Sequence, residues 1–592
     1  MGTHAKLSRR LSIFAMLLVV LVLALGWRLV DYQLVRAQEI QAESLESRSV
    51  TQTLTALRGE IRDANGQVLA RTVFRYDVNA APKNVGSVFK TVDGVRTERT
   101  VEQIVMELAP LLGLSVEELM LKLQGDSEYS NLAKKVDAQT YNDIKELGIP
   151  WIYFDPFADR LYPNGAVAGN LIGFVGSDGV PLAGLERQYN TCLAGVDGQE
   201  TFERSAEGVR IPTSNVVTQP TENGSTLNLS IDANLQFFAQ QVLADTVNEL
   251  GAQWASAVVV EVETGKLLAA AEAPTVDPND PSASDASNRG SKIFQAAFEP
   301  GSIMKALTSA MVLDTGTADA YDTVPSPDYQ RLDFPGGWIK DSFGHEKFNL
   351  TLGGVLRYSS NTGMSNFGIK IDKETRYNYL QKFGFGSESA LNFEGESQGI
   401  LHNYKDWDKM TNYATTYGQG ISVTGIQMAY AYQAMANGGV RLDPILVENC
   451  MSEDGTIEYA PTQKATRVLD ASTAKLNINL MEKVVEFGGV GQNAAVEGYR
   501  VAGKTGTAQI KDGSGYGSQF AISFYGIAPA ENPKFVVGVT IYKGQGVSNS
   551  LKATGPFKAI MSQALKSYRV PPSTTLSPDL PSGSQGEVEP RN

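Results

Sequence analysis

The first thirty residues separate into a basic start and a long apolar run. Lys6, Arg9 and Arg10 precede a stretch without charge from Leu11 to Trp27. As a helix this stretch spans roughly 26 Å, and its continuation to Val30 approaches the roughly 30 Å hydrocarbon core of a bilayer. Because the positive charges precede the span, the pattern predicts one transmembrane anchor with a cytoplasmic N-terminus.

The same segment also fits a cleaved secretory signal with a small-residue site at Ala24–Gly26. The anchor is favoured, because the run is long for a signal and Trp27 and Tyr32 suit a membrane interface. Under either interpretation the rest of the chain works outside the cytoplasm. We therefore expect a single-pass protein of the cell membrane whose main part is extracytoplasmic.

Beyond the anchor, the polarity pattern predicts a stalk and then a β-rich module. Residues 35–52 are polar and helix-prone, and Asn65–Gly66 marks a tight turn between two short strands. Apolar residues recur at helical spacing within residues 100–147, which predicts helices there. The glycine-rich, irregular sequence that follows to about residue 228 favours an extended β-rich arrangement.

A second, larger domain is predicted to start near Leu229. Asp232 is a suitable N-cap for a helix with one apolar face. Two strand pairs, within residues 257–271 and 521–542, flank a helical middle. This order predicts an α/β domain whose sheet joins both ends of the sequence. From Pro571 the chain is rich in Pro, Ser and Thr, which predicts a disordered tail.

Composition narrows the chemistry. With 42% hydrophobic residues the chain can bury a large core, and its net charge of −14 disfavours nucleic-acid binding. Three histidines and two cysteines exclude zinc sites built from Cys and His. His4 precedes the apolar run, so only His345 and His402 remain for a Ser-His-Asp triad, which is therefore disfavoured. A nucleophilic serine here is expected to use another base, and no metal or cofactor is predicted.

The two cysteines, Cys192 and Cys450, are too few for a disulfide framework. They can pair with each other across the chain or remain separate, since sequence spacing does not give distance. Two separate buried thiols are the favoured interpretation.

The segment Pro300–Lys305 contains S-x-x-K at the start of an apolar helical face. Ser302 is thereby expected at a helix N-terminus, with Lys305 one turn further along. A desolvated lysine can lose its proton and act as the base for such a serine. A simple helix cap is the alternative for Ser302. The same spacing at Ser87–Lys90 and Ser472–Lys475 is interpreted as chance on solvated surface.

Two further motifs follow in order. Ser359 and Asn361 form S-x-N, in which the hydroxyl can relay a proton and the amide can bind both Lys305 and a substrate amide. The alternative is that Asn361 caps a helix beginning at Thr362. Lys504 then opens K-T-G before a strand, where a lysine beside small residues suits an anionic carboxylate; an ordinary strand entry is the alternative. The three motifs in this order are specific together.

These residues resemble the S-x-x-K, S-x-N and K-T-G triplet of penicillin-binding proteins and serine β-lactamases. Three more segments are similar to motifs of class B penicillin-binding proteins: Arg58–Ala70, Gly184–Asn190 and Gly418–Thr424. The resemblance covers most of residues 11–570 and favours the cell-division, FtsI-type members.

The resemblance implies an α/β fold of the penicillin-binding and serine β-lactamase type. It has a central antiparallel sheet with helices, carried on an extended β-rich pedestal behind one N-terminal transmembrane helix. The expected parts are a cytoplasmic N-terminus (1–10), the anchor (11–30), a stalk and a pedestal similar to the dimerisation domain (31–228), the transpeptidase domain (229–570) and the tail (571–592).

The resemblance also implies residue roles in a D,D-transpeptidase that cross-links peptidoglycan. Ser302 would attack the penultimate D-Ala of a stem peptide, and β-lactams would acylate the same serine. The expected catalytic residues are Ser302, Lys305, Ser359, Asn361 and Lys504. The expected substrate-binding residues are Ser302, Thr505, Gly506 and Thr507, of which Ser302 and Thr507 would supply the oxyanion-hole N–H groups.

Several related functions stay open at this point. A D,D-carboxypeptidase, a β-lactamase or a β-lactam sensor would share the triplet, whereas a non-enzymatic scaffold and a bifunctional class A enzyme are disfavoured. The expected partners are stem peptides ending in D-Ala-D-Ala, β-lactams, the membrane, an FtsW-like polytopic glycan polymerase and other division proteins. A septal role is favoured, and an elongation-type enzyme is its alternative.

Overall fold

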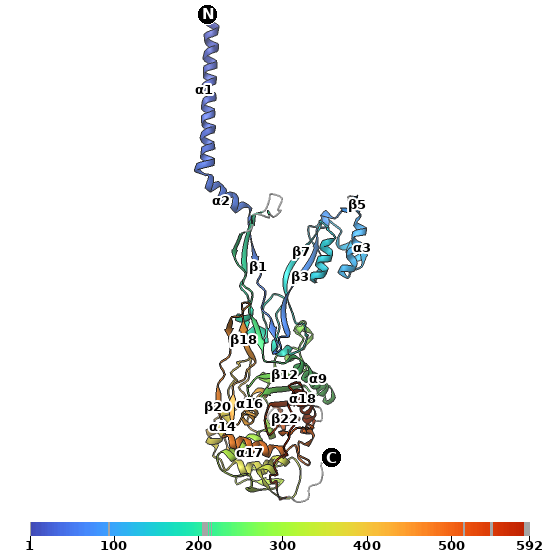
Figure 1. The fold of residues 1–592 in the computed structure, drawn as a ribbon, viewed down its shortest axis with the longest axis vertical. Helices are drawn as coiled ribbons and strands as arrows, with labels where there is room; N and C mark the ends of the chain where they lie inside the picture. The colour runs from blue at the N-terminus through green and yellow to red at the C-terminus, as the bar shows by residue number, and fades with distance from the viewer. Residues whose placement is uncertain are drawn as a thin grey trace. The chain divides into compact units, whose positions relative to one another are not determined.

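The computed structural model describes residues 2–584 apart from 93–94, 204–210, 212–213, 215, 513–514 and 545–548. The chain forms two units (Figure 1). One unit comprises residues 1–57 with 194–224, and the other comprises residues 58–193 with 225–592.

The first unit starts with a long apolar helix. Its candidate membrane span, Leu7–Val35, has no residue of its most apolar stretch buried in the protein. The span is longer than the predicted run from Leu11 to Trp27, because the helix continues unbroken on both sides. The strands of this unit form an antiparallel sheet of order β1-β8-β9. The bounds are α1 (Gly2–Val30), the π-helix η1 (Asp31–Val35), α2 (Ala37–Arg48), β1 (Ser49–Leu54), β8 (Gly198–Glu203) and β9 (Val216–Gln219).

The second unit begins with an arm that carries a small helical cluster with its own hydrophobic core. The long strands β3 and β7 pair along their length. The predicted turn at Gly66 (φ +81°) joins β2 to β3, which pair antiparallel. The predicted helices between residues 100 and 147 are present, but a strand, β6, interrupts them. The bounds are β2 (Ile61–Arg62), β3 (Val68–Ala80), η2 (Pro82–Asn84), β4 (Val88–Val92), β5 (Val95–Arg99), α3 (Val101–Leu112), α4 (Val116–Lys122), β6 (Ser130–Val136), α5 (Ala138–Glu146) and β7 (Ile152–Leu161).

A mixed sheet joins this arm to the rest of the second unit. Strand β10 lies parallel to β2 and antiparallel to β18, so segments far apart in sequence share one sheet. A disulfide joins Cys192 to Cys450 of β18, a strand of this sheet, with the two Cα atoms 6.2 Å apart, so the prediction of separate thiols is wrong. The bounds are α6 (Gly169–Ile172), α7 (Gly184–Gln188), α8 (Asn190–Leu193), β10 (Thr226–Leu229), β18 (Val447–Met451) and β19 (Ile457–Tyr459).

A five-stranded antiparallel sheet of order β12-β11-β23-β22-β21 forms the centre of the transpeptidase region, which confirms the predicted α/β fold. It joins the two ends of the domain because β11 pairs with β23, as predicted. Helix α9 begins at the predicted cap, where the Asp232 side chain accepts from the N–H groups of Asn234 and Leu235. The bounds are α9 (Ala233–Leu250), β11 (Trp254–Glu261), β12 (Leu267–Ala273), β21 (Ala502–Asp512), β22 (Gly515–Ala528), β23 (Phe535–Tyr542) and α18 (Thr554–Ser567).

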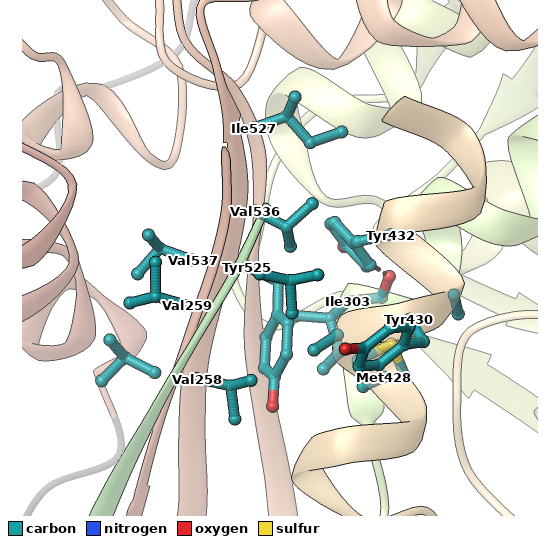
Figure 2. Close-up of a cluster of buried hydrophobic side chains, with 14 of the residues drawn as sticks. Val258, Val259, Ile303, Met428, Tyr430, Tyr432, Tyr525, Ile527, Val536 and Val537 are labelled. Atoms are coloured by element: carbon teal, nitrogen blue, oxygen red, sulfur yellow. Dashed lines mark hydrogen bonds between the residues drawn. The ribbon is translucent and has the colours of Figure 1, made fainter. Parts of the chain in front are cut away.

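Alternate residues of this sheet point to opposite faces, as Figure 2 shows for its strands. Val258, Tyr525 and Val536 face helix α16 (Gly425–Ala436), every residue of which is buried. Helices α9 and α18 pack against each other and against the sheet. This layering explains why the strands read as continuous apolar runs.

Shorter elements surround the central layers. They are η3 (Pro281–Ala283), η4 (Ala286–Asn288), α10 (Lys292–Gln295), η5 (Gly301–Ile303), α11 (Met304–Asp314), β13 (Thr323–Ser326), β14 (Tyr329–Arg331), β15 (Trp338–Lys340), β16 (Phe348–Thr351), α12 (Leu352–Tyr358), α13 (Asn361–Gly368), α14 (Lys373–Lys382), η6 (Tyr404–Asp406), α15 (Lys409–Ala414), β17 (Val440–Leu442), β20 (Ala465–Arg467), α17 (Ala471–Glu482), η7 (Gln492–Ala494), η8 (Ser550–Ala553) and β24 (Gly583–Ser584).

The tail corrects the prediction of disorder from Pro571. Its backbone and side chains find partners on the domain: the Ser573 hydroxyl accepts from the Arg500 N–H at 2.9 Å, and the Thr351 hydroxyl donates to the Pro581 carbonyl at 2.6 Å. Strand β24 then pairs antiparallel with β16. Order therefore comes from docking rather than from apolar content; residues 585–592 lie outside the described part of the chain.

Candidate functional site

Ser302 lies in the tight turn η5, directly before helix α11. Its neighbour Gly301 has a φ of +54°, and a Cβ there would lie 2.6 Å from the Thr507 carbonyl oxygen. The Gly301 N–H donates to the Gly418 carbonyl at 2.9 Å. Only glycine suits this position, because the backbone is left-handed and strand β21 approaches it closely.

Residues of the buried core also hold the turn that carries Ser302. The Tyr432 hydroxyl, on the buried helix α16, donates to the Ile303 carbonyl at 2.9 Å, drawn as a dashed line in Figure 2. On strand β21, a Cβ at Gly506 would lie 3.0 Å from the Ile303 side chain and 3.1 Å from the Pro300 carbonyl. Gly506 thus lets the strand pass against the turn that carries the serine.

Two buried lysines meet at one serine hydroxyl. The Lys504 ammonium donates to Ser359 Oγ at 2.9 Å, and the Lys305 ammonium lies 3.3 Å from the same atom. Lys305 also donates to the Ser359 carbonyl at 2.5 Å, and Lys504 to Thr505 Oγ1 at 3.1 Å. Both lysine side chains are fully buried. The three predicted motifs are therefore in direct contact around Ser359.

Burial changes the protonation of Lys305. It lowers the pKa of the ammonium from 10.5 to about 7, and the negative charge of Asp341 opposes this shift. No carboxylate lies within ion-pair distance of Lys305 among the described residues. A lysine with such a pKa is partly neutral at physiological pH and can accept a proton.

The S-x-N segment is held in an unusual conformation. Ser359 ends α12 with a φ of +58°, a left-handed conformation that is costly for a residue with a side chain. The helix that follows is capped by Ser360, whose hydroxyl accepts from the Gly363 N–H, so the alternative that Asn361 is the cap is wrong. The Asn361 amide donates to the Lys340 carbonyl at 2.8 Å; no hydrogen bond joins it to Lys305 among the described residues.

An open cavity of about 680 Å³ lies over this cluster. Five of the predicted residues line it: Ser302, Ser359, Asn361, Thr505 and Thr507. Lys305, Lys504 and Gly506 lie buried beneath the lining. The structure thus brings all eight predicted residues together, with the hydroxyl groups at the surface of the cavity and the ammonium groups behind them.

Other lining residues were not predicted. They come from β15 and its following loop, from the Gly418 turn, from the segment between α17 and η7, from β21 and β22, and from η8 with the residue before it: Lys340, Ser342, Phe343, Tyr417, Gln419, Val490, Gln509, Phe520, Asn549, Ser550 and Leu551. Only Gln419 and the adjacent Tyr417 had a signal, because Gln419 lies within the glycine-rich segment Gly418–Thr424, which resembles a family motif. The remaining residues lie in segments without a distinctive pattern.

The two other S-x-x-K matches lie elsewhere. Ser87 is exposed in the arm, and Ser472 and Lys475 are exposed on α17. Neither serine lines the cavity. Their interpretation as chance matches on solvated surface is confirmed for Ser472–Lys475 and, for the serine, at Ser87.

Comparison with known proteins places this geometry in a class. Residues 255–562 match the penicillin-binding protein transpeptidase domain, and residues 53–229 match the penicillin-binding protein dimerisation domain. The crystal structure of penicillin-binding protein 3 from Mycobacterium tuberculosis, complexed with aztreonam, superposes with a TM-score of 0.69. It is 27% identical and covers 90% of this chain and 100% of its own.

Full-length relatives agree. Penicillin-binding protein PbpB of Mycolicibacterium smegmatis is 32% identical over 591 residues, which is 95% of this chain and 90% of that protein. Peptidoglycan D,D-transpeptidase FtsI of Escherichia coli is 28% identical over 579 residues, which is 96% of this chain and 93% of that protein. The chain belongs to the class B penicillin-binding proteins, and it is a serine-type peptidoglycan D,D-transpeptidase.

Proposed function

We propose that Ser302 is the nucleophile of this transpeptidase and that Lys305 is its general base. The observation that carries the proposal is the convergence of Lys305 and Lys504 on Ser359, beside the turn that holds Ser302. Burial favours a neutral Lys305 over the opposing effect of the Asp341 charge, and the neutral amine is the form that accepts a proton.

In the acylation step, Ser302 Oγ forms a bond to the carbonyl carbon of the penultimate D-Ala. Its proton passes to the neutral Lys305 amine, and the carbonyl oxygen becomes an oxyanion. When the tetrahedral intermediate collapses, the bond to the terminal D-Ala nitrogen breaks. That nitrogen receives a proton through the Ser359 hydroxyl, which Lys305 and Lys504 both contact. The products are free D-Ala and a Ser302 ester.

The cavity lining supplies the rest of the chemistry. The N–H groups of Ser302 and Thr507 stabilise the oxyanion, and Thr505 with the Lys504 charge behind it binds the substrate carboxylate. Asn361 orients the substrate amide. An amine of a neighbouring stem peptide then attacks the ester, forms the cross-link and returns Ser302 to its hydroxyl form. A β-lactam would acylate Ser302 in the same way and remain bound.

The orientation and the boundaries are also part of the proposal. The basic residues before the apolar span favour a cytoplasmic N-terminus. The Cys192–Cys450 disulfide supports an extracytoplasmic catalytic domain, because disulfides persist in oxidising compartments. The matched ranges support a pedestal that ends near residue 228 and a catalytic domain that follows it. Protease outside intact spheroplasts should then degrade everything beyond about residue 35, whereas a mature N-terminus near residue 27 would indicate a cleaved signal.

We further propose that the enzyme acts at the septum beside an FtsW-like polymerase. Similarity to FtsI over 96% of the chain supports this role. The described chain carries one candidate span, which could contact a polytopic partner in the membrane. The FtsW-like partner would polymerise the glycan strands that this enzyme cross-links. Depletion should give filaments or chains of undivided cells, and a fluorescent fusion should collect at midcell. Rounded cells with normal septa would instead indicate an elongation enzyme.

Labelling with a fluorescent penicillin, followed by peptide mapping, tests the catalytic assignment. Ser302→Ala should abolish covalent labelling, while the matched controls Ser87→Ala and Ser472→Ala should label like the parent. Label that persists in the Ser302 variant would refute the assignment. The product formed from a synthetic stem peptide and an acceptor amine distinguishes transpeptidation from carboxypeptidation.

A further inference from the structure

A buried carboxylate holds the start of helix α13, where the S-x-N motif lies. Asp341 Oδ1 accepts from the backbone N–H groups of Asn361 at 2.6 Å and of Thr362 at 3.1 Å. The preceding residue, Lys340, accepts from the Asn361 side-chain amide through its carbonyl. One short segment after β15 therefore binds both the backbone and the side chain of Asn361.

His345 holds this carboxylate from the other side. Its Nε2 lies 3.0 Å from Asp341 Oδ2, and its Nδ1 lies 2.6 Å from the Glu346 carbonyl oxygen. The side chains of His345 and Asp341 are only 2% and 1% exposed. The imidazole also stacks on Phe348, with ring centres 4.2 Å apart. These contacts leave the ring little freedom to turn away.

The surroundings of His345 favour the imidazolium. Both ring nitrogens face oxygen acceptors, and a neutral imidazole has only one N–H to donate. The negative groups that face the ring are Asp341 and, further away, Asp328; the Phe348 ring of β16 and the Phe343 ring also pack against the imidazole. Burial alone would lower the pKa of His345, but the hydrogen bonds to Asp341 and the Glu346 carbonyl outweigh it, and the pKa is raised.

We propose that Asp341 and His345 form a brace that positions Asn361 for acylation of Ser302, and that protonation of His345 strengthens this brace. Both are positioning residues rather than catalytic ones, since neither lines the cavity. The inference rests on the proposed role of Ser302. Because the raised pKa favours the protonated form in the folded chain, the brace is complete at low pH and weakens as pH rises through the His345 pKa.

Acylation kinetics of the full-length chain in detergent micelles test the brace. Asp341→Asn should slow penicillin acylation roughly tenfold or more, because a small misplacement of a substrate-orienting group is costly. His345→Gln should slow it several-fold at pH 6, and the deficit should shrink towards pH 9. The matched control is His402→Gln: this histidine is exposed, and its backbone carbonyl rather than its ring accepts from Trp407 Nε1.

The pH dependence separates positioning from general loss of structure. A deficit of His345→Gln that is equal at pH 6 and pH 9, or rates equal to the parent at both, would overturn the proposal. Asp341→Asn acylating at the parent rate would overturn it as well.

A second measurement, the titration of His345, is made on the parent chain, and the variant serves only to assign the resonance. Three histidines give three imidazole resonances in the labelled full-length chain, and the one absent from His345→Gln is assigned to His345. It should titrate above the ordinary value for histidine, and a midpoint at or below that value would overturn the brace. If Ser302 were not the nucleophile, peptide mapping of the parent would find no penicillin label at Ser302. The titration of His345 does not depend on that result, so it tests the brace separately.

Discussion

The second unit buries charge in two contrasting ways. In the pedestal, Glu186 accepts from Arg58 Nε at 2.6 Å and from Arg160 Nε at 2.7 Å, and its side chain is fully buried. In the catalytic cluster, Lys305 is equally buried but has no carboxylate within ion-pair distance among the described residues. The paired charges hold structure, whereas burial without an ion pair lowers the pKa of Lys305 and makes its amine available for chemistry.

The largest expected effect follows removal of the uncompensated lysine. Lys305→Met should slow acylation by a β-lactam about 10²–10⁴-fold, because the serine loses its general base. Lys305→Arg should fail as well, since arginine does not give up its proton. Stopped-flow measurement with a fluorescent penicillin gives the rates. Parent-like acylation by either variant would remove Lys305 from the mechanism.

Lys305→Met should not lower the stability of the fold. Because the folded pKa of Lys305 is about 7 and its ordinary value is 10.5, the unfolded chain binds more protons between these values. Lys305 therefore contributes a stability that rises with pH across this window, and Lys305→Met should remove that contribution to the slope. At pH 6 the variant should melt at the same temperature as the parent or higher.

For the buried ion pairs of Glu186 with Arg58 and Arg160, we expect a loss of stability and no change in acylation rate. Glu186→Gln should lower the free energy of unfolding by about 3–5 kcal/mol, because two buried guanidinium groups lose their shared carboxylate. Urea unfolding measures this change, while the acylation rate of the folded fraction should match the parent. A Glu186→Gln variant that is as stable as the parent but acylates slowly would contradict this prediction, because it would assign Glu186 to the chemistry rather than to the stability of the fold.

Loss of the Cys192–Cys450 disulfide should lower the free energy of unfolding somewhat less than Glu186→Gln does. Replacing both Cys192 and Cys450 by alanine should lower the free energy of unfolding by about 2–4 kcal/mol, since the bridge closes a long loop. Reduction of the parent should act in the same direction. Acylation of Ser302 should remain at the parent rate, and a large loss of rate would show that the bridge also positions the catalytic cluster.

The smallest effect on stability is expected for an ion pair that is exposed to solvent. Lys552 and Glu249 lie 3.2 Å apart, with side chains 52% and 69% exposed. Removing this pair by Lys552→Gln should change the free energy of unfolding by under about 1 kcal/mol, because water already screens both charges. A loss as large as that of Glu186→Gln would show that burial does not decide the value of a charge pair here.

The sequence predicted those features that depend on nearby residues. The helix from Ala233 begins at its own cap, Asp232, and the strands from Trp254 to Ala273 surround a short turn. The three motifs identified the site because each places its residues on one turn, cap or strand. These elements carry their signal within a few residues, so no knowledge of the fold was needed.

What the sequence did not predict depends on distant partners. The tail is ordered because Pro581 meets Thr351, and the cysteines pair because their strands and helices share one region of the unit. Asp341 and the Lys340 carbonyl bind Asn361 across 20 and 21 residues. None of these partners stands out by composition or spacing.

The pH dependence of Ser302 acylation tests the central claim most directly. If a buried Lys305 with a pKa of about 7 is the base, the acylation rate of the parent should rise with pH with a midpoint near 7, and the weakening of the His345 brace should lower the plateau at high pH only several-fold. Stopped-flow labelling from pH 5 to pH 10 gives this profile. A rate that is independent of pH, or one that rises only near the ordinary lysine value of 10.5, would contradict the account.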